Sequence, residues 1–162
     1  MTKDPSTPSS APGPSNAFRK DRSPGYLANH MARLFAQRLH QRIRPLGLAP
    51  AQFVALLELW EGDGLTQREL VERLDVEQAT MANTLNRMER DGLIERRAHE
   101  TDARARTVHL TDRAWALREP AQAAAREVNA MAMADVADAD RERFVAIMHS
   151  AIGRMKSEEG AR

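Results

Sequence analysis

The sequence predicts a mainly α-helical fold that also carries one small β-hairpin, an α+β class, and two patterns within residues 66–111 support that prediction. In the first half of this stretch apolar residues recur every three or four positions, the period of a helix with one buried face. In the second half they alternate with polar residues, the period of a strand. A short helix, a turn, a second helix and a hairpin therefore follow one another, which is the order of a winged helix-turn-helix.

A capping box starts the first of these helices. Thr66 and Glu69 stand three positions apart, so each side chain can satisfy a backbone N–H at the helix start. This signature predicts a helix over residues 66–74, and a break follows at residues 75–76.

The second helix, over residues 77–88, has one apolar and one polar face. Its buried stripe consists of Met81, Leu85 and Met88. The opposite face carries side chains able to donate to and accept from base edges: Gln78, Thr80, Asn83, Thr84 and Arg87. These residue types favour DNA binding over a merely solvated face, which would usually carry Glu and Lys.

A hairpin follows the helix stop at Gly92. Residues 93–97 and 106–110 are β-prone and are separated by a loop at residues 98–105. Val108 and Leu110 alternate with polar neighbours, so one face of the hairpin can cover the helices. The tip then projects two cations toward a neighbouring groove: Arg104 and Arg106.

Three segments of this region resemble the MarR family, the multiple-antibiotic-resistance regulators of bacteria: Gly-Leu-Ile-Glu-Arg at 92–96, Asp-Ala-Arg at 102–104 and Val-His-Leu-Thr at 108–111. The resemblance covers about residues 26–155. It implies that the second helix lies in the major groove and that Arg104, oriented by Asp102, enters the minor groove. It also implies base or phosphate contacts for Gln78, Thr80, Asn83, Thr84 and Arg87.

Two helix starts depart from the family pattern. The family usually has Ser or Thr where this chain has Ala49 and Glu77, so both starts lack that cap. A lost cap costs about 1 kcal/mol, which affects stability more than fold identity.

Four further helices complete the expected fold. The first spans residues 26–44 and is ended by Pro45, and the second spans about residues 50–60. The third spans about residues 113–136 with a kink at Pro120, and the fourth spans residues 138–156. The last carries more apolar surface than one neighbouring helix would cover, and the resemblance implies that the first and last helices form a homodimer. Such a dimer would place two reading helices ~34–36 Å apart, on a pseudo-palindromic operator.

The expected organisation is one MarR-like domain over residues 24–157. Within it, residues 24–44 and 113–157 supply the dimerisation helices, and residues 48–111 form the winged helix-turn-helix. The Pro/Ser-rich residues 1–23 and the end at 158–162 are expected to be disordered, because they cannot bury enough apolar surface to offset ordering.

Composition excludes several function classes. The chain has no cysteine, which excludes disulfide switching, thiolate nucleophiles and cysteine zinc sites. No phosphate loop, nucleophile elbow or helical His pair is present, so we expect no enzyme, no catalytic residue, no metal site and no cofactor. No apolar run approaches the ~18 residues of a membrane span, and no signal peptide is evident, so a cytoplasmic location without a membrane partner is expected.

Bulk charge does not by itself indicate DNA. The net charge is only +1, and residues 66–113 hold nine arginines against ten acids. A cationic stripe precedes that region, with no acid between its members: Arg33, Arg38, Arg42 and Arg44. Such a stripe fits either contact with phosphates or an anionic ligand, or an ordinary solvated face.

The predicted function is a sequence-specific transcriptional regulator of double-stranded DNA, a repressor modulated by a small organic effector such as an anionic aromatic. By analogy with relatives, an effector pocket would be lined by His30, Arg33, Leu34, Trp60 and Trp115. The competing interpretation is that both tryptophans are ordinary core residues, so no ligand residues are assigned. The alternative function is a winged-helix protein-interaction module without operator binding.

Overall fold

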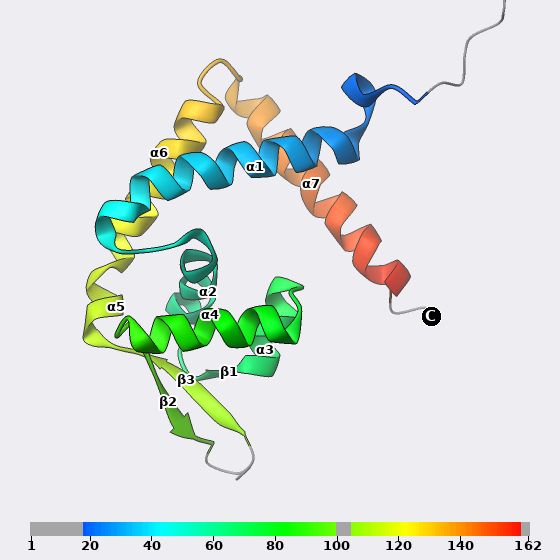
Figure 1. Ribbon diagram of the computed structural model, residues 1–162. Helices are drawn as coiled ribbons and strands as arrows, with labels where there is room; N and C mark the ends of the chain where they lie inside the picture. The colour runs from blue at the N-terminus through cyan, green and yellow to red at the C-terminus, as the bar shows by residue number, and fades with distance from the viewer. Residues whose placement is uncertain (1–17, 100–104, 160–162) are drawn as a thin grey trace, which may run out of the picture. The chain divides into compact units, whose positions relative to one another are not determined.

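The computed structural model describes residues 18–99 and 105–159 (Figure 1). The chain divides between residues 34 and 35 into two compact units. Arg104, Asp102 and most of the predicted tail lie outside the described residues. In the first unit, Lys20–Arg22 form one 3₁₀ turn. The first helix, α1, then runs over Pro24–Ile43, close to the predicted span, and crosses from the first unit into the second.

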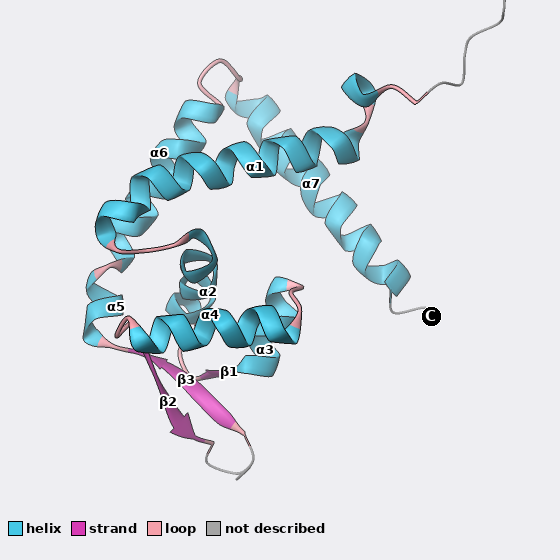
Figure 2. Ribbon diagram, viewed as in Figure 1, coloured by secondary structure: helices cyan, strands magenta, loops and turns pink. Residues whose placement is uncertain are grey.

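The second unit contains a winged helix-turn-helix, which confirms the predicted fold class (Figure 2). Its elements after a 3₁₀ turn at Arg44–Leu46 are α2 (Pro50–Glu61), β1 (Leu65–Thr66), α3 (Gln67–Leu74), α4 (Gln78–Arg90), β2 (Ile94–Ala98), β3 (Arg106–Leu110), α5 (Asp112–Ala116), α6 (Arg118–Ala132) and α7 (Asp138–Glu159). The strands form an antiparallel sheet in the order β1-β3-β2. Strand β1 was not predicted, because two residues are too short to show an alternating pattern.

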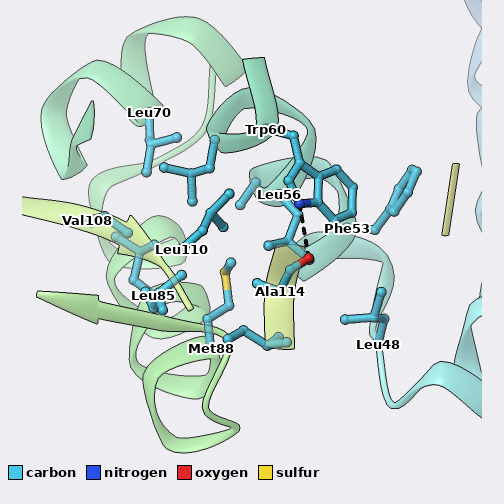
Figure 3. Packing of buried hydrophobic residues seen from close by; sticks show 14 of the residues in the cluster. Leu48, Phe53, Leu56, Trp60, Leu70, Leu85, Met88, Val108, Leu110 and Ala114 are labelled. Carbon is cyan, nitrogen blue, oxygen red and sulfur yellow. Dashed lines mark hydrogen bonds between the residues drawn. The ribbon is translucent and has the colours of Figure 1, made fainter. Parts of the chain in front are cut away.

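One apolar core joins α2, α3, α4 and the sheet (Figure 3). The side chains with no exposed surface include Leu56 from α2, Leu70 from α3, and Leu85 and Met88 from α4. Burial of side chains of this size contributes about 1.5–3 kcal/mol each. No helix among the described residues is long and apolar enough to cross a membrane.

The two tryptophans have different environments. Trp60 is buried beside Phe53, and its indole Nε1–H donates to the carbonyl oxygen of Ala114 at 3.1 Å (Figure 3). Trp115 is 41% exposed, with the guanidinium of Arg118 5.9 Å from its ring centroid. The interpretation of both as core residues is therefore correct for Trp60 and wrong for Trp115. It is Ala114 that points inward on α5, and one residue along a helix turns the side chain by about 100°.

The helix starts follow the sequence closely. The N–H of Glu69 donates to the Thr66 hydroxyl at 3.2 Å, and the N–H of Thr66 donates to the Glu69 carboxylate at 2.7 Å, which confirms the capping box. Ala49 and Glu77 make no side-chain cap. Gln52 partly compensates at α2, since its amide oxygen accepts from the N–H of Ala49 at 2.9 Å.

The helix predicted over residues 113–136 with a kink at Pro120 is in fact two helices: α5 ends at Ala116, and α6 begins at Arg118 and ends at Ala132. Pro120 explains the place of the break. A proline has no N–H to donate to the carbonyl four residues earlier, and its ring clashes with that carbonyl, which here belongs to Ala116. The break therefore falls at Leu117 rather than at the proline itself.

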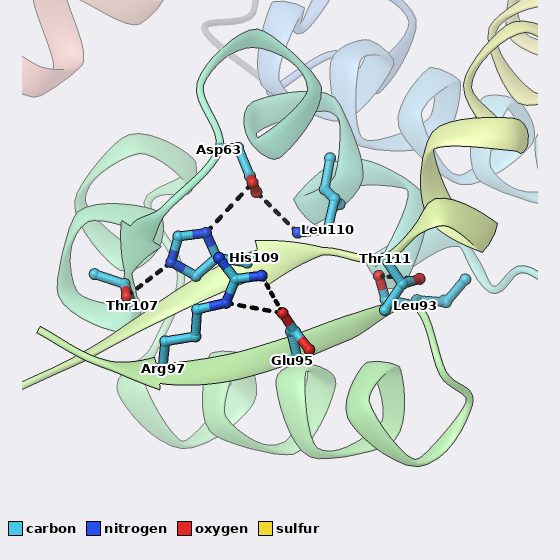
Figure 4. Close-up of polar contacts among 8 residues, drawn as sticks. All are labelled: Asp63, Leu93, Glu95, Arg97, Thr107, His109, Leu110 and Thr111. Carbon is cyan, nitrogen blue, oxygen red and sulfur yellow. Dashed lines mark hydrogen bonds and ion pairs between the residues drawn. The ribbon is translucent and has the colours of Figure 1, made fainter.

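Polar contacts attach the base of the wing to the helical body (Figure 4). The Asp63 carboxylate, in the turn after α2, accepts from the N–H of Leu110 at 2.8 Å and lies 3.4 Å from Nδ1 of His109. Directly after β3, the Thr111 hydroxyl donates to the carbonyls of Gly92 and Leu93, which precede β2. Both strands of the wing are thus held where they leave the core.

We predict that Thr66→Ala lowers the free energy of unfolding by about 1 kcal/mol, because the N–H of Glu69 loses its acceptor. Thr66→Ser, which keeps the hydroxyl, should stay close to the parent protein. Urea denaturation followed by circular dichroism measures both. Equal stability of the Ala and Ser variants would contradict the role of the cap.

The same box should make stability depend on pH. The N–H of Thr66, and then its hydroxyl, hold the pKa of Glu69 below its ordinary value. A lowered native pKa stabilises the fold above the unfolded-state pKa, and that contribution is lost as the pH falls through the native pKa. The parent should therefore lose stability relative to Glu69→Gln as the pH falls through the native pKa of Glu69. Around neutrality the stability difference between the two proteins should remain constant.

Candidate nucleic-acid interface

Helix α4 presents one face to the core and the opposite face outward. Met81, Leu85 and Met88 are buried, whereas Thr80, Asn83 and Arg87 are exposed. Thr84 is only 9% exposed, and its hydroxyl donates to the carbonyl oxygen of Thr80 at 3.0 Å. The structure therefore places Thr84 at the border of the core and leaves its polar atom engaged within the helix.

The two helices of the helix-turn-helix are joined at their starts. Nε2 of Gln67, in the first turn of α3, donates to Oε1 of Gln78 in the first turn of α4 at 3.2 Å. This contact orients the predicted site residue Gln78. Gln67 itself was not predicted as part of the site, because a single Gln after a capping box carries no signal of its own.

A hollow of about 600 Å³ lies between α3, α4 and the wing. Gln78, Ala82 and Asn86 line it from α4 at four-residue spacing, so they share one edge of the helix. Arg106 lines it from β3 and Arg68 from α3. The structure thus brings together two residues predicted for DNA contact, Gln78 and Arg106, and adds cations and amides that the sequence pattern did not indicate.

Arg96 of β2 connects the wing to α4 across this hollow. Its guanidinium donates to the Glu89 carboxylate at 2.6 Å and to the Asn86 amide oxygen at 2.8 Å. With its side chain only 20% exposed, Arg96 is held in a defined place. The contact links two elements whose relative position decides whether a helix and a wing can meet adjacent grooves.

A second cleft, of about 460 Å³, lies on the other edge of α4. Thr84, Arg87 and Arg90 line it at three-residue spacing, together with Arg44 and the first turn of α2. Asn83, on the exposed face, lines neither of the two hollows. The predicted residues of α4 are therefore distributed across its outer surface, with Gln78 on the wing edge and Arg87 on the opposite edge.

Local ion pairs explain how a region with balanced charge can expose free cations. Glu72 pairs with Arg68 and raises the pKa of that guanidinium, first through a hydrogen bond and then through its charge. The Asp91 carboxylate accepts from Arg90 and then from Gln52, which together lower its pKa. Each such ion pair cancels one cation against one acid, so the charge of any patch of this surface depends on which arginines lie outside the pairs rather than on the net charge of the chain.

The described residues assign neither an effector site nor a metal site. His30, Arg33 and Leu34 belong to the first unit, and Trp60 and Trp115 belong to the second, so these five residues are not assigned to one pocket. Among residues 18–99 and 105–159, no group of three His, Asp or Glu side chains could hold a metal ion.

This geometry defines a winged helix-turn-helix protein with a polar, cationic outer face on its second helix. A family model described as the MarR family matches residues 46–105. The chain is 33% identical over 116 residues to the uncharacterized HTH-type transcriptional regulator YwoH of Bacillus subtilis, which covers 72% of this chain and 84% of that protein. The chain therefore belongs to the MarR family of transcriptional regulators, which are not enzymes.

Two further similarities agree with that assignment. The chain is 28% identical over 120 residues to the HTH-type transcriptional repressor Rv2887 of Mycobacterium tuberculosis, covering 74% of this chain and 86% of that protein. The crystal structure of the S. aureus MepR–DNA complex has the same fold, with a TM-score of 0.75 at 22% identity, covering 82% of this chain and 98% of that one.

We predict that Arg96→Ala increases amide hydrogen exchange in β2 and β3 more than in α2, because the wing loses its side-chain connection to α4. Arg97→Ala is the matched control. Arg97 lies on the same strand, but it pairs with Glu95 two residues away and joins no second element. Hydrogen exchange measured by mass spectrometry tests this prediction, and equal exchange in the two variants would argue against the connection through Arg96.

Proposed function

We propose that this protein is a sequence-specific DNA-binding regulator that acts as a homodimer on a pseudo-palindromic operator. The outer face of α4 carries the proposal: Asn83 is exposed at its centre, with Gln78 and Arg87 on either side. Amide groups can form paired hydrogen bonds with base edges in the major groove, and a guanidinium group can bind either a base edge or a phosphate. Thr80, which is exposed beside them, completes the proposed contact set, and Thr84 is left out because its hydroxyl is engaged.

Exposed apolar side chains support the homodimer. Helix α7 exposes Val145, Ile147, Met148, Ile152 and Met155. In the first unit, α1 exposes Tyr26, Leu27 and Leu34. A concentration of this kind marks an interaction surface, and the family resemblance indicates that a second copy covers it. Two copies of α4 would then lie about one DNA turn apart, ~34–36 Å.

Family resemblance also supports a repressor that a small organic molecule of the anionic aromatic class releases from DNA. A dimer bound to a promoter excludes other proteins from the same DNA. An effector that changes the separation of the two α4 helices would weaken the binding of the dimer to DNA. The regulator would act in the cytoplasm, where a bacterial operator lies.

Fluorescence anisotropy of labelled DNA tests the central proposal. The probes are the DNA flanking the protein's own gene and a pool selected from a random library, with random DNA as competitor. We expect saturable binding that resists the competitor and weakens as salt rises, because phosphate contacts release counterions. If selection enriches no sequence and binding shows no salt dependence, the protein-interaction module becomes the better description.

For the wing, we predict that Arg104→Ala lowers operator affinity by about tenfold or more, while the dimer remains intact. The reason is the loss of the cation that we propose to enter the minor groove. Arg97→Ala removes a cation from the adjacent strand and should have a smaller effect. Operator affinity of Arg104→Ala equal to that of the parent would remove the proposed wing contact.

For the dimer, we predict that Ile152→Glu yields a monomer, because it buries a charge in an apolar interface. Light scattering at micromolar concentration should show half the parent mass, and operator affinity should fall. Ile152→Leu, which keeps the apolar surface, should remain a dimer. A parent protein that is already monomeric at this concentration would contradict the proposal directly.

A further inference from the structure

We propose that Arg44, Arg87 and Arg90 form a phosphate clamp, a cleft that grips the DNA backbone beside the outer face of α4 without reading its sequence. The inference rests on the proposed function, because it assigns a role to one edge of the same DNA interface. It concerns the cleft of about 460 Å³ opposite the wing.

The cleft is assembled from three separated parts of the chain. Arg44 comes from the 3₁₀ turn after α1, and Arg87 and Arg90 come from the last turns of α4. The third part is the segment at the start of α2: Gly47 has no side chain, and Ala49 and Ala51 have only a methyl group, which leaves room for a DNA backbone to approach. All three arginines are exposed, so their guanidinium groups are accessible from solvent.

The charge of the cleft is strongly positive. Its one acid is Asp91, whose carboxylate is occupied by the side chains of Arg90 at 3.0 Å and Gln52 at 2.8 Å. Among the described residues, Arg44 and Arg87 have no acidic partner. Three cations against one carboxylate leave the cleft with an excess positive charge, which is the electrostatic requirement for binding a polyanion.

The chemistry of the lining favours phosphate over bases. The two uncharged polar side chains of the lining are almost fully buried and already bonded: Gln52 is 4% exposed and donates to Asp91, and Thr84 is 9% exposed and donates to the carbonyl oxygen of Thr80. Guanidinium groups remain, and their planar donors match a phosphate in a two-point contact. Contacts of this kind position a protein on DNA but do not distinguish sequences.

The clamp also separates two roles on α4. Gln78 and Asn86 lie on the wing edge, whereas Arg87 and Arg90 lie on the edge of the clamp. Asn83 lies between the two edges and is left to contact bases. On this assignment Arg87, which the sequence left open between base and phosphate contact, binds phosphate.

The test compares Arg44→Gln and Arg90→Gln with the parent, on the selected operator and on random DNA, over a series of salt concentrations. Each substitution should weaken binding to both DNAs by the same factor, so that their affinity ratio is unchanged. The slope of log affinity against log salt should become shallower by about two, since each lost phosphate contact contributes about 0.9 and a dimer carries two copies. Arg44→Lys and Arg90→Lys keep the charge and should retain the parent slope.

Arg126→Gln is the matched control. Arg126 is an exposed arginine of α6 that pairs with Glu119, and it lines neither hollow. Its variant should keep the parent affinity and slope. Circular dichroism melting confirms that each variant is folded.

The outcomes separate the two proposals. If the parent selects an operator while both Gln variants keep its affinity and slope, the phosphate clamp is overturned and the regulator stands. If either Gln variant instead lowers the ratio of operator to random affinity, the cleft reads sequence and the clamp is likewise overturned. A parent that shows no salt-sensitive DNA binding overturns the operator-binding function itself and the clamp with it.

Discussion

The burial of one apolar stripe on α4 is the constraint on which the rest of the interface depends. Met81, Leu85 and Met88 are each at most 3% exposed, and they pack into the core shared with α2, α3 and the sheet. Because a helix turns about 100° per residue, anchoring this stripe sets the rotation of α4 about its axis. That rotation decides which side chains face outward, so the polar face follows from the apolar one.

The wing depends on the same core but is positioned by polar contacts. Asp63 holds the end of β3 at Leu110, Thr111 holds the start of β2 through Leu93, and Arg96 connects β2 to α4. Each contact joins the hairpin to a segment outside its two strands, so side-chain hydrogen bonds add to the packing that holds the hairpin. Hydrogen bonds of this type contribute about 0.5–1.5 kcal/mol each, and together they restrict the angle between the wing and α4.

Charge acts locally in this protein. The overall balance is near neutral, but Glu72, Glu89 and Asp91 are each engaged by a neighbouring cation or amide. Arg44 and Arg87, by contrast, line a cleft with little opposing charge. A surface can therefore attract a polyanion although the chain as a whole has a net charge of +1. The arrangement of charges, rather than their sum, distinguishes the two edges of α4.

The sequence by itself determined most of the helices, the two strands of the hairpin, and their order. The capping box at Thr66 and Glu69, the helical stop at Gly92 and the alternation in β3 are local signals, each governed by residues within a few positions of one another. Propensity and period express such short-range physics well. Even the break near Pro120 was indicated, although its exact place required knowing that the clash falls four residues earlier.

Only the tertiary structure decided what depends on contacts between distant segments. Strand β1 exists because β3 pairs with it, and Thr84 is buried because the core extends further around α4 than the stripe alone suggests. Trp115 is exposed because the adjacent Ala114 is the residue of α5 that points inward. The cleft of Arg44, Arg87 and Arg90 combines residues more than forty positions apart, and the hydrogen bonds of Arg96 depend on the approach of β2 to α4. No local pattern encodes such proximity, because it arises when the apolar core closes.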